Sequence, residues 1–256
     1  MPNPFEPEIL IEERGPIRIV TLNRPEARNA ANQALHRKVS RVWRYLDDDP
    51  EVRAVVLTGA GKAFCAGGDM ELFRALHSDH VTRRRIIDEA GRVAREMVAF
   101  SLPIVAAVNG AAVGLGANLA VLSDLVLMAE SSYLQDPHVE VGLTAADGGA
   151  PIWPLYMSIL RVKEYLFTGA RIPADKAVEL GLATRVVPDD KLFDEALELA
   201  TRLAEQPPQA LQTTKRAVNM HLARAMDGIV DYALAAEFQS FDTPEHQAVV
   251  ERFLGR

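Results

Sequence analysis

Cysteine is almost absent from this chain of 256 residues, which carries a single thiol at Cys65. One cysteine cannot form a disulfide within the chain, so the composition favours a reducing compartment, and we expect a cytoplasmic protein. The sequence also lacks an unbroken apolar run of membrane-spanning length, because asparagines and glycines interrupt the most apolar stretch, residues 102–122. Its first residues have neither the basic nor the apolar region of a signal peptide. A membrane partner is therefore not expected.

Positive charge is outnumbered, with 28 lysines and arginines against 35 acidic residues and a net charge of −7. Such a balance provides no basic surface for a phosphate backbone, so nucleic acid is not an expected partner. A local group of basic residues could still bind one nucleotide-bearing small molecule. The remaining composition, 48% apolar and 25% charged, is that of an ordinary globular protein.

Three motifs that would bind a nucleotide cofactor or a metal are incomplete. The stretch Gly59-Ala-Gly-Lys62 resembles a phosphate-binding loop, but Ala63 stands where that loop needs a serine or a threonine. Neither glycine-rich segment of the chain completes the dinucleotide-binding pattern. His77 and His80 have no third ligand near them in the sequence. ATP, NAD and metal ions are therefore not expected as cofactors.

Strand-like and helix-like segments alternate along the first part of the chain, which indicates an α/β fold. Residues 8–13 and 17–22 flank a Gly-Pro turn as the strands of a hairpin. Further segments are predicted as buried strands at 54–58, 104–108 and 124–128, and as helices at 33–46, 81–100 and 114–122. After about residue 190 the periodicity is helical. The apolar faces of 196–204 and 230–238 could cover the chain's own core or pack against neighbouring subunits, and packing between subunits is the favoured use.

Two glycine-rich turns follow strand-like runs, at Lys62–Asp69 and at Asn109–Asn118. Small residues leave the backbone of such turns exposed, so that two main-chain N–H groups can converge on one oxygen. An oxyanion hole of this kind stabilises the negative charge that develops when a thioester carbonyl becomes an enolate. The turns therefore predict carbonyl chemistry that depends on main-chain amides.

Five motifs resemble, in order and spacing, those of the enoyl-CoA hydratase/isomerase (crotonase) family. They are Asn23–Ala30, Thr58–Asp69, Pro103–Gly110, Ser123–Leu125 and Gly181–Val187. The resemblance implies an α/β fold with a crotonase-like spiral of ββα units over residues 1–190 and a C-terminal α-helical region for oligomerisation over residues 191–256. It also implies an acyl-CoA thioester as substrate, no cofactor beyond the coenzyme A of that substrate, and assembly into a homotrimer or a hexamer.

The same resemblance implies roles for particular residues. The oxyanion hole would be formed by the N–H groups of Ala66 and Leu115. Coenzyme A would bind along the first loop and the first glycine-rich turn, at Arg24, Ala27, Arg28, Ala66, Gly67, Gly68, Asp69 and Met70. A solvated surface role is the alternative for Arg24 and Arg28, and Cys65 is interpreted as a packed thiol rather than a nucleophile.

The chain departs from the family at the two positions where its hydratases carry catalytic glutamates. Asn118 and His138 occupy these positions. An amide can only orient water or a carbonyl, whereas an imidazole can exchange a proton near neutral pH. A catalytic histidine needs a partner that fixes its tautomer, and Asp147 is the predicted partner, with Glu140 as second choice. The structural alternative is that His138 is a buried histidine without a catalytic role and that Asp147 only caps a helix that begins near Ala150.

These observations lead to three hypotheses. The first is an enoyl-CoA hydratase (a lyase) or isomerase of fatty acid metabolism, in which the amides hold the thioester oxygen, His138 moves the proton and Asn118 positions water. The second is a hydrolase of carbon–carbon bonds in β-diketones or β-ketoacyl compounds, because His138 followed by Asp147 resembles the arrangement in such family members. The third is a non-catalytic acyl-CoA-binding scaffold, which the missing glutamates leave open.

Overall fold

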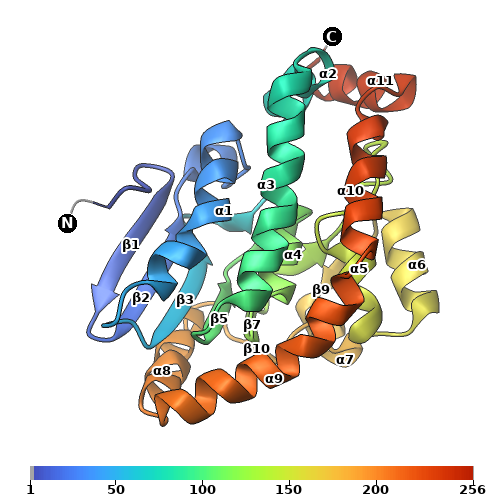
Figure 1. Cartoon of the computed structure of the whole chain (residues 1–256). Coiled ribbons are helices and arrows are strands. Elements are labelled where there is room, and N and C mark those ends of the chain that lie inside the picture. The colour runs from blue at the N-terminus through green and yellow to red at the C-terminus, as the bar shows by residue number, and fades with distance from the viewer. Residues whose placement is uncertain (1–2, 256) are drawn as a thin grey trace.

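The computed structural model describes residues 3–255, which form a mixed α/β fold around two sheets (Figure 1). The larger sheet has six strands in the order β1-β2-β3-β5-β7-β10. These strands are β1 Ile9–Arg14, β2 Ile17–Leu22, β3 Ala54–Gly59, β5 Ile104–Val108, β7 Leu125–Ala129 and β10 Arg185–Val187. Strands β1 and β2 pair antiparallel as the predicted hairpin, and the strands that follow in this sheet are parallel. The α/β class predicted from the alternating segments is confirmed.

A smaller second sheet carries the turns that form the site. It consists of β4 Ala63–Cys65, β6 Ala111–Val113, β8 Tyr133–Gln135 and β9 Ile172–Pro173, in that order. The chain passes from the larger sheet to the smaller one from β3 to β4, from β5 to β6 and from β7 to β8, and so winds as a spiral. Because β4, β6 and β8 run parallel, the turns that follow them leave the same edge of the sheet.

Helices connect the strands and cover the sheets. They are α1 Gln33–Asp47, α2 Met70–Ser78, α3 His80–Ala99, α4 Leu115–Val121, α5 Gly149–Ile152, α6 Ile159–Thr168, α7 Ala174–Leu180, α8 Leu192–Ala204, α9 Pro208–Met226, α10 Ile229–Ser240 and α11 Pro244–Phe253, with 3-10 turns η1 Pro25–Ala27 and η2 Trp153–Leu155. The Asn32 side chain accepts the Leu35 N–H at 2.9 Å, which begins α1 where the sequence predicted it. Asp79 caps α3 in the same way through Thr82. Across residues 3–255, we find no helix with the length and apolar character needed to cross a membrane.

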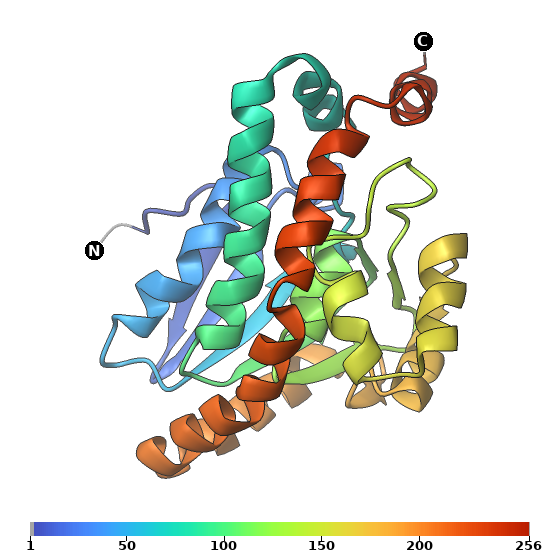
Figure 2. The ribbon, with the colours of Figure 1, turned by 45° about the vertical axis from the view of Figure 1, so that its right-hand side comes forward.

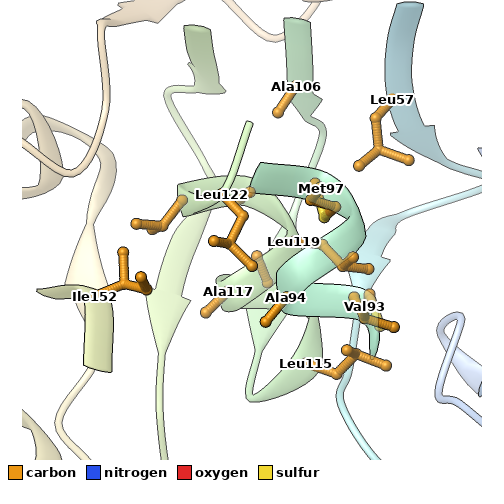
Figure 3. Packing of buried hydrophobic residues seen from close by; sticks show 14 of the residues in the cluster. Leu57, Val93, Ala94, Met97, Ala106, Leu115, Ala117, Leu119, Leu122 and Ile152 are labelled. Carbon is orange, nitrogen blue, oxygen red and sulfur yellow. The ribbon is translucent and has the colours of Figure 1, made fainter. Parts of the chain in front are cut away.

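Helix α4 lies at the centre of the main apolar core, and all of its residues are buried. Figure 3 shows Leu119 of α4 beside Met97 and Val93 of α3. Apart from Asn118, the residues of this short helix are small or apolar on every side, and such a helix requires a buried position because no face of it suits water. The packing therefore fixes the N-terminus of α4, and with it the amide of Leu115, beneath the second glycine-rich turn.

The C-terminal helices cover the chain's own core. Helix α8 buries Ala196, Ala200 and Ala204 against the larger sheet, and α10 runs along α3 (Figure 2), where it buries Ala233 and Leu234. Of the two uses expected for these apolar faces, the structure shows the first, since the buried residues of both faces pack on the chain's own core. Assembly into a trimer or a hexamer stays a prediction.

Helix α9 is attached to the core by a buried charge. Lys215 is 9% exposed, and its Nζ donates to the Leu102 carbonyl and to Asp124 Oδ2, both at 2.7 Å. Burial lowers the pKa of Lys215, while the charge and hydrogen bond of Asp124 oppose that effect. An unpaired ammonium at this depth would be costly, so the pair holds α9 in one place.

Candidate active site

The site lies where the turns after β4, β6 and β8 leave the smaller sheet. These turns contain Ala66–Gly68, Gly114–Leu115 and Pro137–His138, and all three line one cavity of about 720 Å³. Asp147, from the loop before α5, and Glu237, from α10, form further parts of the cavity wall. Main-chain amides, the imidazole of His138 and the carboxyl groups of Asp147 and Glu237 therefore border one cavity.

The first two turns approach each other so closely that glycine is required in both. Gly67 has a φ of 87°, and a Cβ added there would lie 3.0 Å from the carbonyl oxygen of Val113. A Cβ at Gly116 would lie only 2.3 Å from the carbonyl oxygen of Cys65. The missing side chains thus allow the two backbones to sit side by side, as the glycine content of both turns indicated.

Hydrogen bonds decide which amides of the first turn can reach a ligand. The Ala66 N–H donates to the Arg28 carbonyl at 3.0 Å, because the segment before α1 pairs with this turn. The Gly67 N–H donates to the neighbouring cysteine sulfur. Within residues 3–255, neither the Gly68 N–H nor the Leu115 N–H has a hydrogen-bond partner. The structure therefore contradicts the prediction for Ala66, and the available amides are those of Gly68 and Leu115.

His138 is held by an aspartate that the sequence analysis did not select. Asp136 Oδ1 is hydrogen bonded to Nδ1 of His138 and accepts the backbone N–H of His138 at 3.3 Å. On the other side of the ring, His138 Nε2 lies 3.8 Å from Asp147 Oδ1, which is too far for a hydrogen bond. The prediction that Asp147 fixes the tautomer is thus wrong, since Asp136 occupies that place. Glu140, the second choice, is exposed and makes no hydrogen bond with His138.

Asp147 instead lies between the His138 imidazole and the side-chain amide of Asn118. Asn118 Nδ2 donates to Asp147 Oδ1 at 2.6 Å, and both residues are buried. Helix α5 has Gly148 at its N-cap with no side-chain cap bond, so the alternative in which Asp147 caps that helix is wrong. Asn118 Oδ1 is buried without a hydrogen-bond partner in the described chain. The amide therefore orients Asp147 and leaves one acceptor unused.

Burial and mutual charge shift the pKa of each titratable group in this cluster. Burial by itself lowers the pKa of His138, but the charge and hydrogen bond of Asp136 and the charges of Asp147 and Glu237 outweigh it and raise that pKa to about 10. Burial raises the pKa of Glu237 to about 8 and also raises the pKa of Asp147, although the charge of His138 opposes both shifts. At neutral pH the cluster thus contains an imidazolium and a protonated Glu237.

Glu237 was missed because the sequence gives no local sign of it. It is a single acidic residue on the apolar face of α10, and only the packing of α10 against α3 brings it to the cavity. Glu237 differs from a surface glutamate because it is only 7% exposed and its Oε2 has no hydrogen-bond partner among the described residues.

The residues predicted to bind coenzyme A fall into two groups. Arg28, Ala66–Gly68 and Met70 line the cavity, whereas Arg24, Ala27 and Asp69 do not. The Arg24 guanidinium donates to the Ala30 carbonyl and to Asp69 Oδ2, the latter at 3.1 Å. Asp69 also accepts the Glu71 N–H at the start of α2. Arg24 and Asp69 therefore brace the loops around the cavity, and their contact with coenzyme A stays a prediction.

Cys65 ends β4 next to the cavity but does not line it. The residue is 1% exposed, and burial raises the pKa of its thiol to about 11. A thiol that holds its proton so firmly is a poor nucleophile at neutral pH. This agrees with its interpretation as a packed side chain.

The spiral of paired strands, with a cavity at the edge of its smaller sheet, defines the fold class of this chain. The sequence profile of the enoyl-CoA hydratase/isomerase family matches residues 12–254. The chain belongs to this family, and its fold is the crotonase fold.

Individual relatives agree with this placement. The short-chain-enoyl-CoA hydratase of Clostridium acetobutylicum is 32% identical over 91% of this chain and 87% of its own length. The crystal structure of an enoyl-CoA hydratase/isomerase from Mycobacterium paratuberculosis is 48% identical, with a TM-score of 0.93 over 96% of this chain and 98% of that one. A β-diketone hydrolase from the cyanobacterium Anabaena is 27% identical, with a TM-score of 0.85 over 92% and 94% of the two chains.

Proposed function

We propose that this protein is an acyl-CoA enzyme that adds water to a substrate whose carbonyl is held by the amides of Gly68 and Leu115. One observation carries the proposal: His138, fixed by Asp136 and facing Asp147, lines the same cavity as those two amides. The leading reaction is hydration of an enoyl-CoA, in accord with the names of the relatives.

The two amides would stabilise the enolate form of the thioester. Both N–H groups lack a partner in the described chain, and one of them begins a helix that is fixed by its packing. Donors that are already in place stabilise a developing oxyanion by about 3–4 kcal/mol each, because they need no reorganisation during the reaction. This contribution does not depend on the side chain of Leu115.

The pair His138 and Asp147 can replace two glutamates because hydration needs one proton donor and one proton acceptor. Asp147 would accept a proton from water as its oxygen bonds to the β-carbon. His138 would deliver its Nε2 proton to the α-carbon, where the enolate electron pair forms the new C–H bond. The product is a 3-hydroxyacyl thioester, and transfer of the proton from Asp147 to His138 restores the pair. Isomerisation would need only the movement of one proton between substrate carbons by the same groups.

A second candidate is hydrolysis of a carbon–carbon bond in a β-diketone or a β-ketoacyl compound. The observation that favours it is the His138–Asp147 pair, together with a β-diketone hydrolase among the structural neighbours. Water activated by Asp147 would bond to one carbonyl carbon, the carbon–carbon bond would break, and its electron pair would leave as an enolate held by the two amides. His138 would then protonate the enolate carbon, and a carboxylic acid would be released.

Coenzyme A is proposed as part of the substrate because two arginines, Arg28 and Arg252, lie in the cavity wall among small and apolar residues. Cationic side chains at a cavity wall provide partners for the phosphates of a nucleotide. We further propose a cytoplasmic location and assembly into a homotrimer or a hexamer, which follow from the composition and from the family.

The test is a panel of enoyl-CoA and β-ketoacyl-CoA thioesters and free β-diketones, incubated in ¹⁸O-labelled water and followed by mass spectrometry. Hydration adds one labelled oxygen with no loss of carbon, whereas hydrolysis releases a labelled carboxylic acid. His138→Ala should lower turnover at least tenfold while acyl-CoA binding persists. Binding of acyl-CoA with no product from any panel member would instead show a non-catalytic scaffold. Unchanged turnover in His138→Ala would reject the proposed role of the imidazole.

A further inference from the structure

The cavity contains a second imidazole–carboxylate pair that has no part in the proposed proton transfers. His36 on α1 and Glu89 on α3 are 7% and 3% exposed, and His36 Nδ1 lies 3.1 Å from Glu89 Oε2. Arg37 approaches the other carboxylate oxygen, with its Nε 3.6 Å from Oε1. Glu89 therefore fixes the orientation of the His36 ring, as Asp136 does for His138.

His36 belongs to the cavity wall, and one edge of its ring can meet a bound molecule. Because Nδ1 faces Glu89, that edge carries Nε2, which has no hydrogen-bond partner within residues 3–255. The wall beside it, from Leu72, Ile86 and Ala90, is apolar. His36 shares this cavity with His138 and Asp147, so the pair faces the space in which the proposed reaction would take place.

A plain alkyl chain that displaced water from this part of the cavity would leave His36 Nε2 unpaired. A buried polar group that loses its partner weakens binding by roughly one to two orders of magnitude. An acyl group that carries an oxygen there would supply the missing partner.

We propose that the His36–Glu89 pair recognises an uncharged oxygen, a ketone or a hydroxyl, in the acyl part of the substrate. The substrate is then an oxygenated acyl compound rather than a plain fatty acyl chain. This inference depends on the proposed function, because that function places the acyl group in this cavity. A carboxylate is disfavoured at the same position, since it would lie near the acidic side chain of Glu89.

The test compares equilibrium binding of hexanoyl-CoA, 5-oxohexanoyl-CoA and 5-hydroxyhexanoyl-CoA by calorimetry. These thioesters have no double bond and no β-carbonyl, so they report binding without turnover. We expect at least one oxygenated ligand to bind about tenfold more tightly than hexanoyl-CoA. Preference for the ketone means that His36 donates the hydrogen bond, and preference for the hydroxyl means that it accepts one.

The variants identify the residue that causes the preference. His36→Leu should bring the affinities for the plain and the oxygenated ligands together, with His36→Met as a second variant if the leucine protein does not fold. Glu89→Ala should reduce the preference, and Glu89→Gln should restore part of it, because an amide oxygen can still accept from Nδ1. His80→Leu is the matched control, since His80 is exposed and does not line the cavity.

Equal binding of all three ligands by the unchanged protein, or a preference that survives in both His36 variants, would overturn this inference alone. If no thioester binds at all, the proposed function fails and the inference fails with it. The two failures are thus distinguishable in a single titration series.

Discussion

Replacing Asp136 by asparagine should reveal how much the proposed chemistry depends on the carboxylate behind His138. The substitution keeps the shape of the side chain and removes its negative charge. Asp136 supplies both a charge and a hydrogen bond at Nδ1, and these are the largest influences that raise the pKa of His138. We therefore expect the pKa of His138 to fall steeply and the imidazole to be neutral at physiological pH.

The size of the expected change in stability follows from the pKa of His138. The difference between a pKa of about 10 and the ordinary value of 6.5 corresponds to about 5 kcal/mol of preference for the imidazolium. Because the raised pKa favours the charged form in the folded state, this stabilisation is fully present below pH 6.5 and is lost as the pH rises through about 10. Asp136→Asn should remove most of this stabilisation, and should lower turnover on the order of 10⁴-fold, as expected when a histidine loses the carboxylate that fixes its tautomer.

The measurement combines turnover with NMR titration of the imidazole ring between pH 5 and pH 11. The chain has six histidines, so the resonance of His138 is assigned from its absence in His138→Gln. Asp190→Asn is the control, because Asp190 is exposed and far from the cavity wall. A His138 pKa that stays near 10 in Asp136→Asn, with turnover within threefold of the unchanged protein, would refute the reasoning.

Three further results are expected. Asp147→Asn should lower turnover by about 10²–10⁴ in a steady-state assay, because an amide cannot accept the proton of water, and an unchanged rate would assign that proton to another group. Gly67→Ala should destabilise the fold by about 1–3 kcal/mol in urea unfolding, because alanine is strained at a φ of 87° and its Cβ would crowd a carbonyl oxygen; a smaller effect would show that the turn can shift. Because the folded state binds the carboxyl proton of Glu237 more tightly than the unfolded chain does, this residue makes the protein less stable as the pH rises from 4.5 to about 8. Glu237→Gln should remove that pH dependence, and thermal unfolding at several pH values would contradict this if the slope of stability against pH were unchanged.

The elements of the fold could be predicted from local pattern, because the forces that define them act over a few residues. The Asn32 cap, the hairpin and the buried strands were correct for this reason. The packing partner of the C-terminal helices could not be predicted in this way, because an apolar helix face has the same sequence pattern whether it packs on its own sheet or on another subunit. Only the burial of α8 and α10 within the chain decides that question.

Within the site, the residues that sequence reasoning missed depend on contacts between distant segments. The backbone carbonyl of Arg28 accepts the N–H of Ala66, and this contact decides which amide of the first glycine-rich turn is free to bind a ligand. Glu237 and His36 reach the cavity only through helix packing. Asp136 is different, because an aspartate two residues before a histidine commonly bonds the backbone N–H of the second residue, and that local signal could have identified it.

The geometry also explains why one pair of groups suits either candidate reaction. In both, Asp147 takes a proton from water and His138 gives a proton to the carbon that holds the enolate charge, so the two reactions differ only in the carbon that water attacks. That carbon is chosen by where the acyl group lies relative to Asp147. In the proposed mode of binding, the acyl group would contact side chains of α1, α2, α3 and α10 that line the cavity, rather than the turns that would hold the carbonyl. Substitutions on these helices should therefore change which substrate reacts, whereas substitutions in the turns after β4, β6 and β8 should change whether any substrate reacts.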